Sequence, residues 1–182
     1  SDHAMMTSAD GLALGHLCPN LYDSKTLANA VRNAKEVEDT LGVPLIVEYS
    51  TYTARFSGSI WTPEEFFLEL VNAHESLGIL IDLSNVWYNG TNFGFDYRNF
   101  VVQLPADRVV HVHLAGGEVD NGFWSDTHSH AVHAEVFGLL ELLCEKADPD
   151  AIIIERDGNY AEAVSALPDD LRRSKEIVER SR

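Results

Sequence analysis

Apolar runs of strand length alternate along the chain with segments of helical periodicity. Four runs of three or four residues fit buried strands, at 45–47, 79–81, 109–112 and 152–154. Apolar and polar residues do not alternate within these runs, which is typical of parallel strands that are covered by helices on both faces. With a further strand expected at 4–7, the chain contains about five βα units and is predicted to be an α/β protein.

The expected helices lie between these strands. Apolar residues spaced three and four apart predict a helix over 24–41. Thr62, Pro63 and Glu65 supply an N-cap, a proline at the first helical position and a capping-box glutamate, so a second helix should begin there and end near Leu77. The remaining expected helices are 96–104, 133–146 and two short ones within 160–180, separated by Pro168.

The number of βα units limits which α/β architectures the chain can form. A closed (β/α)₈ barrel has eight units and typically about 250 residues, more than this 182-residue chain holds. The sequence therefore predicts either about the C-terminal five-eighths of a barrel, with the earlier strands absent, or an open doubly wound sheet. Either would be a single domain over 1–182, because no linker or repeat interrupts the pattern. The aromatic residues within 87–95, set among glycines and asparagines, are interpreted as a loop wall over a pocket.

Charge and composition narrow the classes of partner. The formal net charge of -16 argues against nucleic acid or an anionic membrane, since both require a basic surface. Cys18 and Cys144 are too few and too distant in sequence for a disulfide framework, so a reducing, cytoplasmic setting is expected. The sequence has neither an apolar run of about 18 residues nor a signal-peptide pattern.

Each of the four strand runs leads into a side chain that binds metals. These residues are Glu48, Asp82, His113 and Glu155. The C-terminal ends of parallel strands meet at one edge of a sheet, where active sites of such folds form, so the four side chains are expected to converge there. The alternative for either glutamate is a structural ion pair with an arginine.

Two loop features add to this prediction. Asp126 and His128 are two residues apart, which in an extended segment places both side chains on one side, as a chelating pair requires. The alternative is a capping Asp beside a solvated His. Asn85 follows Asp82 by three residues and either offers a second oxygen to the same cation or caps the loop. Mixed imidazole and carboxylate donors with open positions suit Fe(II), whereas a closed four-ligand site would indicate structural zinc.

Seven short motifs occur in an order and spacing that resemble one protein family over nearly the whole chain. The family is that of the multinuclear non-haem iron-dependent oxidative enzymes, which includes the methanobactin-synthesis oxidase. The motifs are Ser1-Asp2-His3, Val47-Glu48-Tyr49-Ser50, Asp82-Leu83-Ser84-Asn85-Val86, Asn92-Phe93-Gly94-Phe95-Asp96, His113-Leu114-Ala115-Gly116, Asp126-Thr127-His128 and Ile154-Glu155-Arg156-Asp157.

The resemblance implies a xylose-isomerase-like TIM barrel that holds two or three iron ions at its C-terminal mouth. It further implies that the enzyme uses iron and dioxygen to modify residues, often cysteines, of a ribosomally made precursor peptide, which a partner protein commonly delivers. Carried over residue by residue, the resemblance identifies as iron ligands His3, Glu48, Asp82, Asn85, His113, Asp126, His128 and Glu155. Eight ligands are too many for one ion and indicate a cluster with ions roughly 3.5 to 4 Å apart.

The family also places a histidine on a strand earlier than any in this sequence, so the chain resembles a truncated member. If the missing units are also absent from the molecule, we expect weak metal retention and little activity.

Related barrels provide three alternatives. A zinc endonuclease is disfavoured by the negative charge and by Asn85, which stands where the zinc nucleases have histidine in an Asp-x-x-His motif. A sugar isomerase using magnesium or manganese is disfavoured by the Asp126 and His128 pair and by the scarcity of lysines near strand ends. The third alternative is a scaffold protein that retained the fold without a metal.

Overall fold

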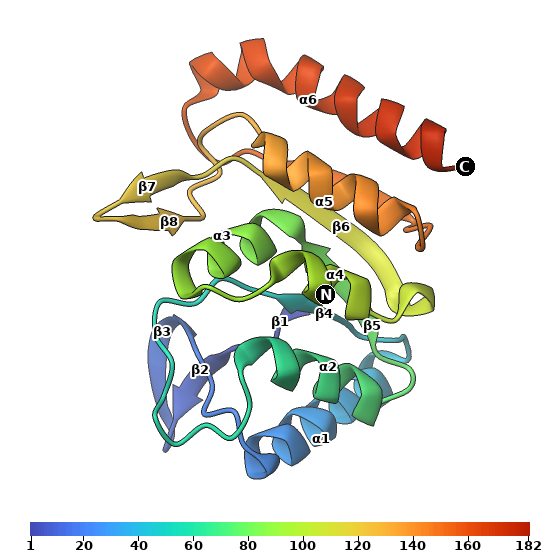
Figure 1. The fold of residues 1–182 in the computed structure, drawn as a ribbon. Coiled ribbons are helices and arrows are strands. Elements are labelled where there is room, and N and C mark those ends of the chain that lie inside the picture. Colours follow the sequence, from blue (N-terminus) through green and yellow to red (C-terminus); the bar gives the residue numbers. More distant parts are fainter. The chain divides into compact units, whose positions relative to one another are not determined.

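The computed structural model describes residues 1–162 and 164–182, which form two compact units, Ser1–Ile79 and Leu80–Arg182. Figure 1 shows their helices and strands. The elements of the first unit are β1 (Asp2–His3), β2 (Met6–Ala9), β3 (Leu12–Cys18), α1 (Ser24–Leu41), β4 (Ile46–Tyr49), α2 (Pro63–Ala73) and the start of β5 (Gly78–Asp82).

Local sequence signals account for both helices of the first unit. Helix α1 has the predicted bounds, with Asp23 as its N-cap and Gly42 in the left-handed conformation as its C-cap. Helix α2 begins with the predicted capping box of Thr62 and Glu65. Its predicted end at Leu77 was wrong.

Helix α2 ends at Ala73 because the next residue leaves the helical conformation. His74 is extended, and its Nε2 lies 2.8 Å from Oε2 of Glu38 on α1. Ser76 donates a hydrogen bond to the same Glu38 oxygen. These contacts turn the chain toward β5, which begins at Gly78.

The strand predicted at 4–7 was also placed wrongly. The strand that pairs in parallel with β4 is β1, with His3 opposite Glu48. Strand β2 instead pairs antiparallel with β3. Asp10 and Gly11 connect these two strands with positive φ values of 49° and 77°, the backbone that an Asp-Gly hairpin turn requires.

The second unit completes β5 and contains the remaining elements. They are α3 (Leu83–Phe93), α4 (Tyr97–Gln103), the 3₁₀ turn η1 (Ala106–Arg108), β6 (Val109–Ala115), β7 (Glu118–Asp120), β8 (Phe123–Ser125), α5 (Ala134–Cys144), β9 (Ala151–Glu155) and α6 (Tyr160–Ser181). Strands β6 and β9 run parallel, and α5 packs against α3, α4 and α6. The apolar side chains of α5, including Val136, Phe137 and Leu140, are almost fully buried in this core.

The main sheet has five strands in the order β1-β4-β5-β6-β9, which confirms the α/β class and the five units. This order has two ends, so the described residues form an open sheet and no closed barrel. The order is compatible with a segment of a barrel, and the complete barrel stays a prediction. The crossover from β6 to β9 passes through the β7–β8 hairpin and α5.

The interpretation of 87–95 as a loop wall was wrong, because helix α3 includes this segment as far as Phe93. Asn, Thr and Gly are weak helix formers, which masks the helix in the sequence. Tertiary burial overrides this propensity, since Leu83, Val86 and Tyr88 are fully buried. Asp82 caps the helix at its start, and Gly94 ends it at φ 74°. A capping Asp followed by apolar residues at i and i+3, with a closing Gly, is the signal that could have revealed it.

The expected break at Pro168 was wrong as well, since α6 continues through it. A proline removes the hydrogen bond to the carbonyl of Val164, and Val164 is 80% exposed, so water can bind that carbonyl. Beyond the proline, Ile177 is buried and the Arg173 guanidinium lies 4.2 Å from the centre of the Phe137 ring. Packing therefore holds the helix together across the weak point.

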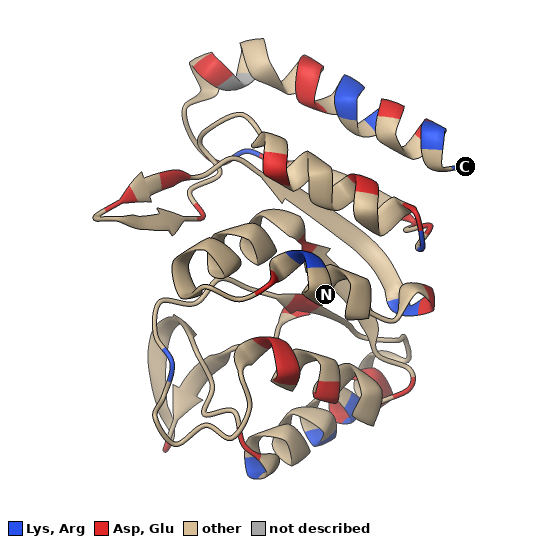
Figure 2. Ribbon diagram, viewed as in Figure 1, with Lys and Arg blue, Asp and Glu red and all other residues tan. Residues whose placement is uncertain are grey.

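Acidic residues occur in both units, where Figure 2 colours them red. On α6 they alternate with basic ones, and Arg172 pairs with both Asp169 and Glu176. Within the described part of the chain, every helix is too short or too polar to cross a membrane.

Candidate metal centre

The centre of the candidate site is Asp82, the last residue of β5 and the N-cap of α3. Its Oδ1 accepts hydrogen bonds from the backbone N–H groups of Ser84 and Asn85, at 2.7 and 3.1 Å. Its Oδ2 is buried and receives no hydrogen bond from the described residues. One oxygen therefore caps the helix, and the other is left for a ligand.

Asn85 lies on the first turn of α3, and its predicted alternative role can be assessed there. The backbone N–H of Asn85 bonds to Asp82, so the loop is capped by Asp82 rather than by the Asn85 side chain. The Asn85 Oδ1 atom is buried and has no hydrogen-bond donor among the described residues. It is available as an oxygen donor to a cation.

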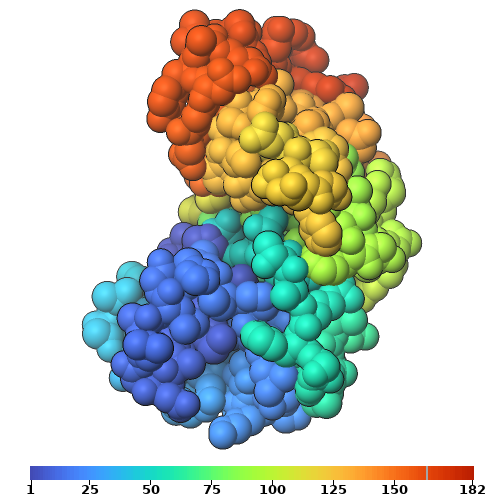
Figure 3. Space-filling model, turned by 90° about the vertical axis from the view of Figure 1, so that its left-hand side faces the viewer, coloured from blue at the N-terminus to red at the C-terminus, as the bar shows by residue number. Residues whose placement is uncertain are grey.

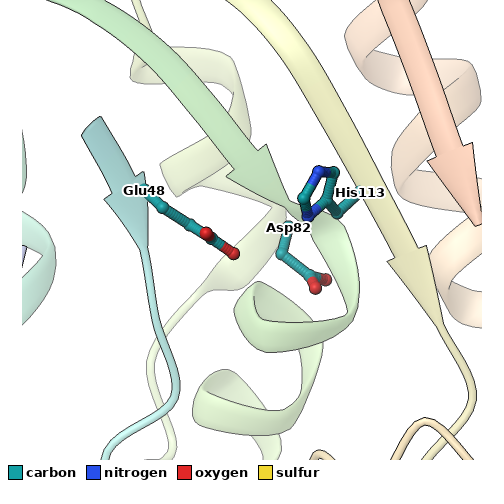
Figure 4. A group of neighbouring side chains, drawn as sticks. All are labelled: Glu48, Asp82 and His113. Carbon is teal, nitrogen blue, oxygen red and sulfur yellow. The ribbon is translucent and has the colours of Figure 1, made fainter. Parts of the chain in front are cut away.

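His113 and Glu155 come from the neighbouring parallel strands β6 and β9. His113 Nδ1 lies 3.3 Å from Glu155 Oε1, with both side chains largely shielded from solvent. Figure 4 shows His113 on β6 and Asp82 where β5 passes into α3; it also labels Glu48 at the end of its own strand, β4. The parallel strands of the second unit thus present their ligand-type residues as the sequence predicted.

Asp126 and His128 form the predicted pair in the loop after β8. His128 Nε2 lies 3.0 Å from Asp126 Oδ1 and 3.6 Å from Glu155 Oε2. The other ring nitrogen, Nδ1, lies 2.8 Å from Asp157 Oδ2. His128 adopts φ 50°, a left-handed conformation that is uncommon for residues other than glycine, although histidine tolerates it better than most.

Asp157 has a role that the sequence did not reveal. Its side chain contacts His128, and its backbone N–H donates to the His128 carbonyl at 3.0 Å. A carboxylate on one imidazole nitrogen directs the other toward a metal, which is the usual support of a metal-binding histidine. The place of Asp157 two residues after Glu155 in the sequence favours a residue that orients Glu155, whereas its contact with His128 depends on the tertiary fold.

Three of these side chains lie close enough together to share one metal ion. One ligand atom each from Asp82, His128 and Glu155 lies within 4.8 Å of the other two. Asp126 Oδ1 and His128 Nε2 are buried, and although they are close, their alignment is not that of a hydrogen bond. The buried Asp82 Oδ2 and Asn85 Oδ1 atoms lack even such an ionic partner among the described residues, which is costly, and a cation beside them would satisfy them.

The pKa values of the site residues also indicate a place for a cation. Burial raises the pKa of Asp82 well above its ordinary value, and the nearby Asp126 and Glu155 carboxylates raise it further. The Asp126 carboxylate, with help from Asp157, raises the pKa of His128 to about 9. Without a metal the site therefore retains protons, which a metal ion would displace on binding.

His3 and Glu48 lie in the first unit. His3 Nε2 is 3.3 Å from Glu48 Oε2, and Glu48 is buried whereas the His3 side chain is 40% exposed. The pair stands at the ends of the parallel strands β1 and β4. Of the eight predicted ligands, the structure thus places six in the second unit and pairs the other two in the first.

A comparison with protein families gives a match over residues 1–179 to the RiPP precursor modification enzymes MbnB/TglH/ChrH. The chain belongs to this family. The match confirms the resemblance that the seven motifs indicated, because the methanobactin-synthesis oxidase belongs to the same group. MbnB/TglH/ChrH proteins are described as enzymes that modify precursor peptides, which are the substrates of RiPP biosynthesis.

Curated relatives carry the name UPF0276 protein. One from Rhizorhabdus wittichii is 30% identical over 178 residues, covering 98% of this chain and 63% of the relative. One from Vibrio parahaemolyticus is 34% identical over 161 residues, covering 86% of this chain and 56% of the relative. The chain therefore spans less than two thirds of the length of these MbnB/TglH/ChrH-type relatives.

The contact between Asp157 and His128 leads to a prediction for this family member. Replacing Asp157 with alanine should weaken metal binding by about ten- to a hundredfold, because the imidazole of His128 loses the group that orients it. Titration of the metal-free protein with Fe(II) under anaerobic conditions measures this. Asp107→Ala removes an equal charge from the exposed η1 turn and should leave the affinity unchanged. Equal affinities for the two variants would contradict the role of Asp157.

Proposed function

We propose that this protein is an iron- and dioxygen-dependent oxidase that modifies residues, including cysteine, of a ribosomally made precursor peptide. The observation that carries the proposal is the set of buried atoms without hydrogen bonds on Asp82, Asn85, Asp126 and His128. These atoms all belong to one compact unit, and they combine oxygen and imidazole nitrogen donors. Membership of a family of precursor-modifying enzymes supports the substrate class.

The chemistry of the donor set favours iron. A site built of carboxylates, an amide oxygen and imidazoles, without cysteine, suits Fe(II) better than the sulfur-rich sites of structural zinc. Iron bound there would supply the redox chemistry with dioxygen, which protein side chains cannot provide. The residues of the chain would hold the ion: Asp82 through Oδ2, His128 through Nε2, and Glu155 through the carboxylate that faces both.

The proposal extends to two or three ions and to all eight predicted ligands. Six of them lie in the second unit, which is more than one ion requires. His3 and Glu48 are included because of the sequence motifs that they occupy and because each ends a strand that parallels the other. A partner protein that delivers the peptide belongs to the proposal through the family resemblance.

The decisive experiment is metal analysis of protein purified without oxygen and then loaded with Fe(II). We expect bound iron, and we expect oxygen to be consumed and a cysteine-containing precursor peptide to change in mass when both are added. Zinc in place of iron would favour the nuclease, magnesium or manganese the isomerase, and no metal the scaffold; each result would overturn the proposal.

A further inference from the structure

One face of α3 carries three polar side chains that hydrogen-bond to the backbone of the segment leading to the metal ligands. Ser84, Tyr88 and Asn92 follow one another at intervals of four residues and therefore share this face of the helix. We call them the α3 ladder. Their partners lie at residues 115, 117 and 124, outside the helix.

Ser84 and Tyr88 hold the end of β6. The Ser84 Oγ accepts from the backbone N–H of Ala115 at 2.7 Å and donates to its carbonyl at 2.9 Å. The Tyr88 hydroxyl accepts from the N–H of Gly117. All the side-chain atoms involved are buried, so these bonds are shielded from competing water.

Asn92 holds the next segment in the same way. Its Nδ2 donates to the Trp124 carbonyl at 2.9 Å, and its Oδ1 accepts from the Trp124 N–H at 2.8 Å. The Trp124 ring stacks on Tyr88, with the ring centres 5.8 Å apart and the planes at 11°. Trp124 precedes Asp126 by only two residues, so the position of Trp124 limits where Asp126 and His128 can lie.

Two glycines allow this close approach. A Cβ atom on Gly116 would lie 2.0 Å from the His130 carbonyl oxygen, and one on Gly117 would lie 2.1 Å from the Ser125 carbonyl oxygen. The backbone N–H groups of Ser129 and His130 bond to the Gly116 carbonyl, which closes the loop that contains both ligands. The loop is thus attached before and after its ligands.

The β7–β8 hairpin between these attachments lies at the surface of the second unit, where Figure 3 shows it in yellow. Val119 is 53% exposed and Phe123 43% exposed, so the hairpin buries little of its own apolar surface. A two-stranded hairpin with little burial is marginally stable by itself. Its place must therefore come from contacts with the rest of the unit: the α3 ladder supplies hydrogen bonds at its base, and Phe123 and Trp124 add ring contacts with Phe93 and Trp87.

We propose that the α3 ladder is a positioning device for the metal ligands Asp126 and His128, with Asn92 as its decisive member. The same helix begins at Asp82 and contains Asn85 in its first turn, so one rigid element sets the place of four predicted ligands. Asn92, Ser84 and Tyr88 are positioning residues that act through the backbone of the loop. The proposal rests on the metal site of the proposed function.

The test compares Asn92→Ala with the wild-type protein and with Thr91→Ala, an exposed neighbour on the same helix. Hydrogen–deuterium exchange of the metal-free protein and anaerobic Fe(II) titration are measured. In Asn92→Ala we expect exchange at 118–128 to be at least about tenfold faster and the affinity for Fe(II) to be about tenfold lower. Thr91→Ala should match the wild type in both measurements.

Asn92→Asp serves as the conservative variant, because its carboxylate still accepts from the Trp124 N–H but cannot donate to the carbonyl. We expect intermediate affinity for Fe(II), and this variant replaces Asn92→Ala if the alanine protein does not fold. Wild-type affinity in the Asn92 variants would overturn the ladder alone. A wild-type protein that binds no metal would overturn both the ladder and the proposed function.

Discussion

Replacing His128 with alanine is expected to abolish turnover and to weaken metal binding by on the order of a hundredfold or more. His128 Nε2 faces the Asp126 and Glu155 carboxylates, so the substitution removes a nitrogen donor from the centre of the site. The loss should exceed the ten- to hundredfold typical of an outer-shell partner such as Asp157. Metal content after anaerobic loading, together with oxygen consumption in the presence of peptide, measures both effects.

Two companion variants separate this effect from structural damage. His128 has φ 50°, which asparagine tolerates better than alanine, so His128→Asn removes the imidazole with less backbone strain. His16→Ala makes the same side-chain change at an exposed position of β3 and should behave as wild type. Unchanged metal content in both His128 variants would contradict the assignment of His128 as a metal ligand.

Replacing Asp82 with asparagine is expected to change stability and metal binding in opposite directions. Asn keeps the oxygen that caps α3 and removes a buried negative charge beside Asp126 and Glu155. The metal-free variant should be more stable than wild type by about 2 to 4 kcal/mol at neutral pH, because burial, and then the nearby Asp126 and Glu155 carboxylates, make the ionised form of Asp82 costly and raise its pKa. It should lose iron, since an amide is a far weaker ligand than a carboxylate.

The raised pKa of Asp82 also determines how the stability of the metal-free protein changes with pH. Asp82 has an ordinary pKa of 3.8, which the folded protein raises to about 7. Between these values the folded state binds the proton more tightly than the unfolded state does, so the stability of the metal-free wild type falls as pH rises. Asp82→Asn should flatten this slope in denaturant titrations between about pH 4 and 7.

Asp96→Asn is the matched control. Asp96 caps α4 in the same way, with Oδ1 accepting from Asn99 N–H at 2.9 Å, but it is exposed. Its substitution should leave metal content and the slope unchanged. A metal-free Asp82→Asn protein less stable than wild type would contradict the raised pKa of Asp82 in the folded protein.

Elements with strong local signals could be predicted, and those held by tertiary contacts could not. Helix α1 has matching caps and apolar periodicity, and it has the predicted bounds. Helix α3 has low intrinsic propensity and exists because its apolar side chains are buried. Helix α6 continues through Pro168 because packing beyond the proline compensates for the lost hydrogen bond. The β7–β8 hairpin was not predicted, although Asn121 and Gly122 at its tip form a recognised turn pair.

The candidate site likewise has features that the sequence predicts and features that depend on tertiary contacts. The sequence by itself determined which ligand-type residues lie at or near the strand ends and the family to which the chain belongs, because both follow from short motifs in a fixed order. Only the tertiary structure decided which atoms are left without hydrogen bonds: Asp82 uses one oxygen for α3, and His128 turns Nε2 inward because Asp157 holds Nδ1. The cap by Asp82 is a local contact, but the burial of its second oxygen and the contact of His128 with Asp157, 29 residues away, depend on the tertiary fold, which no local pattern encodes.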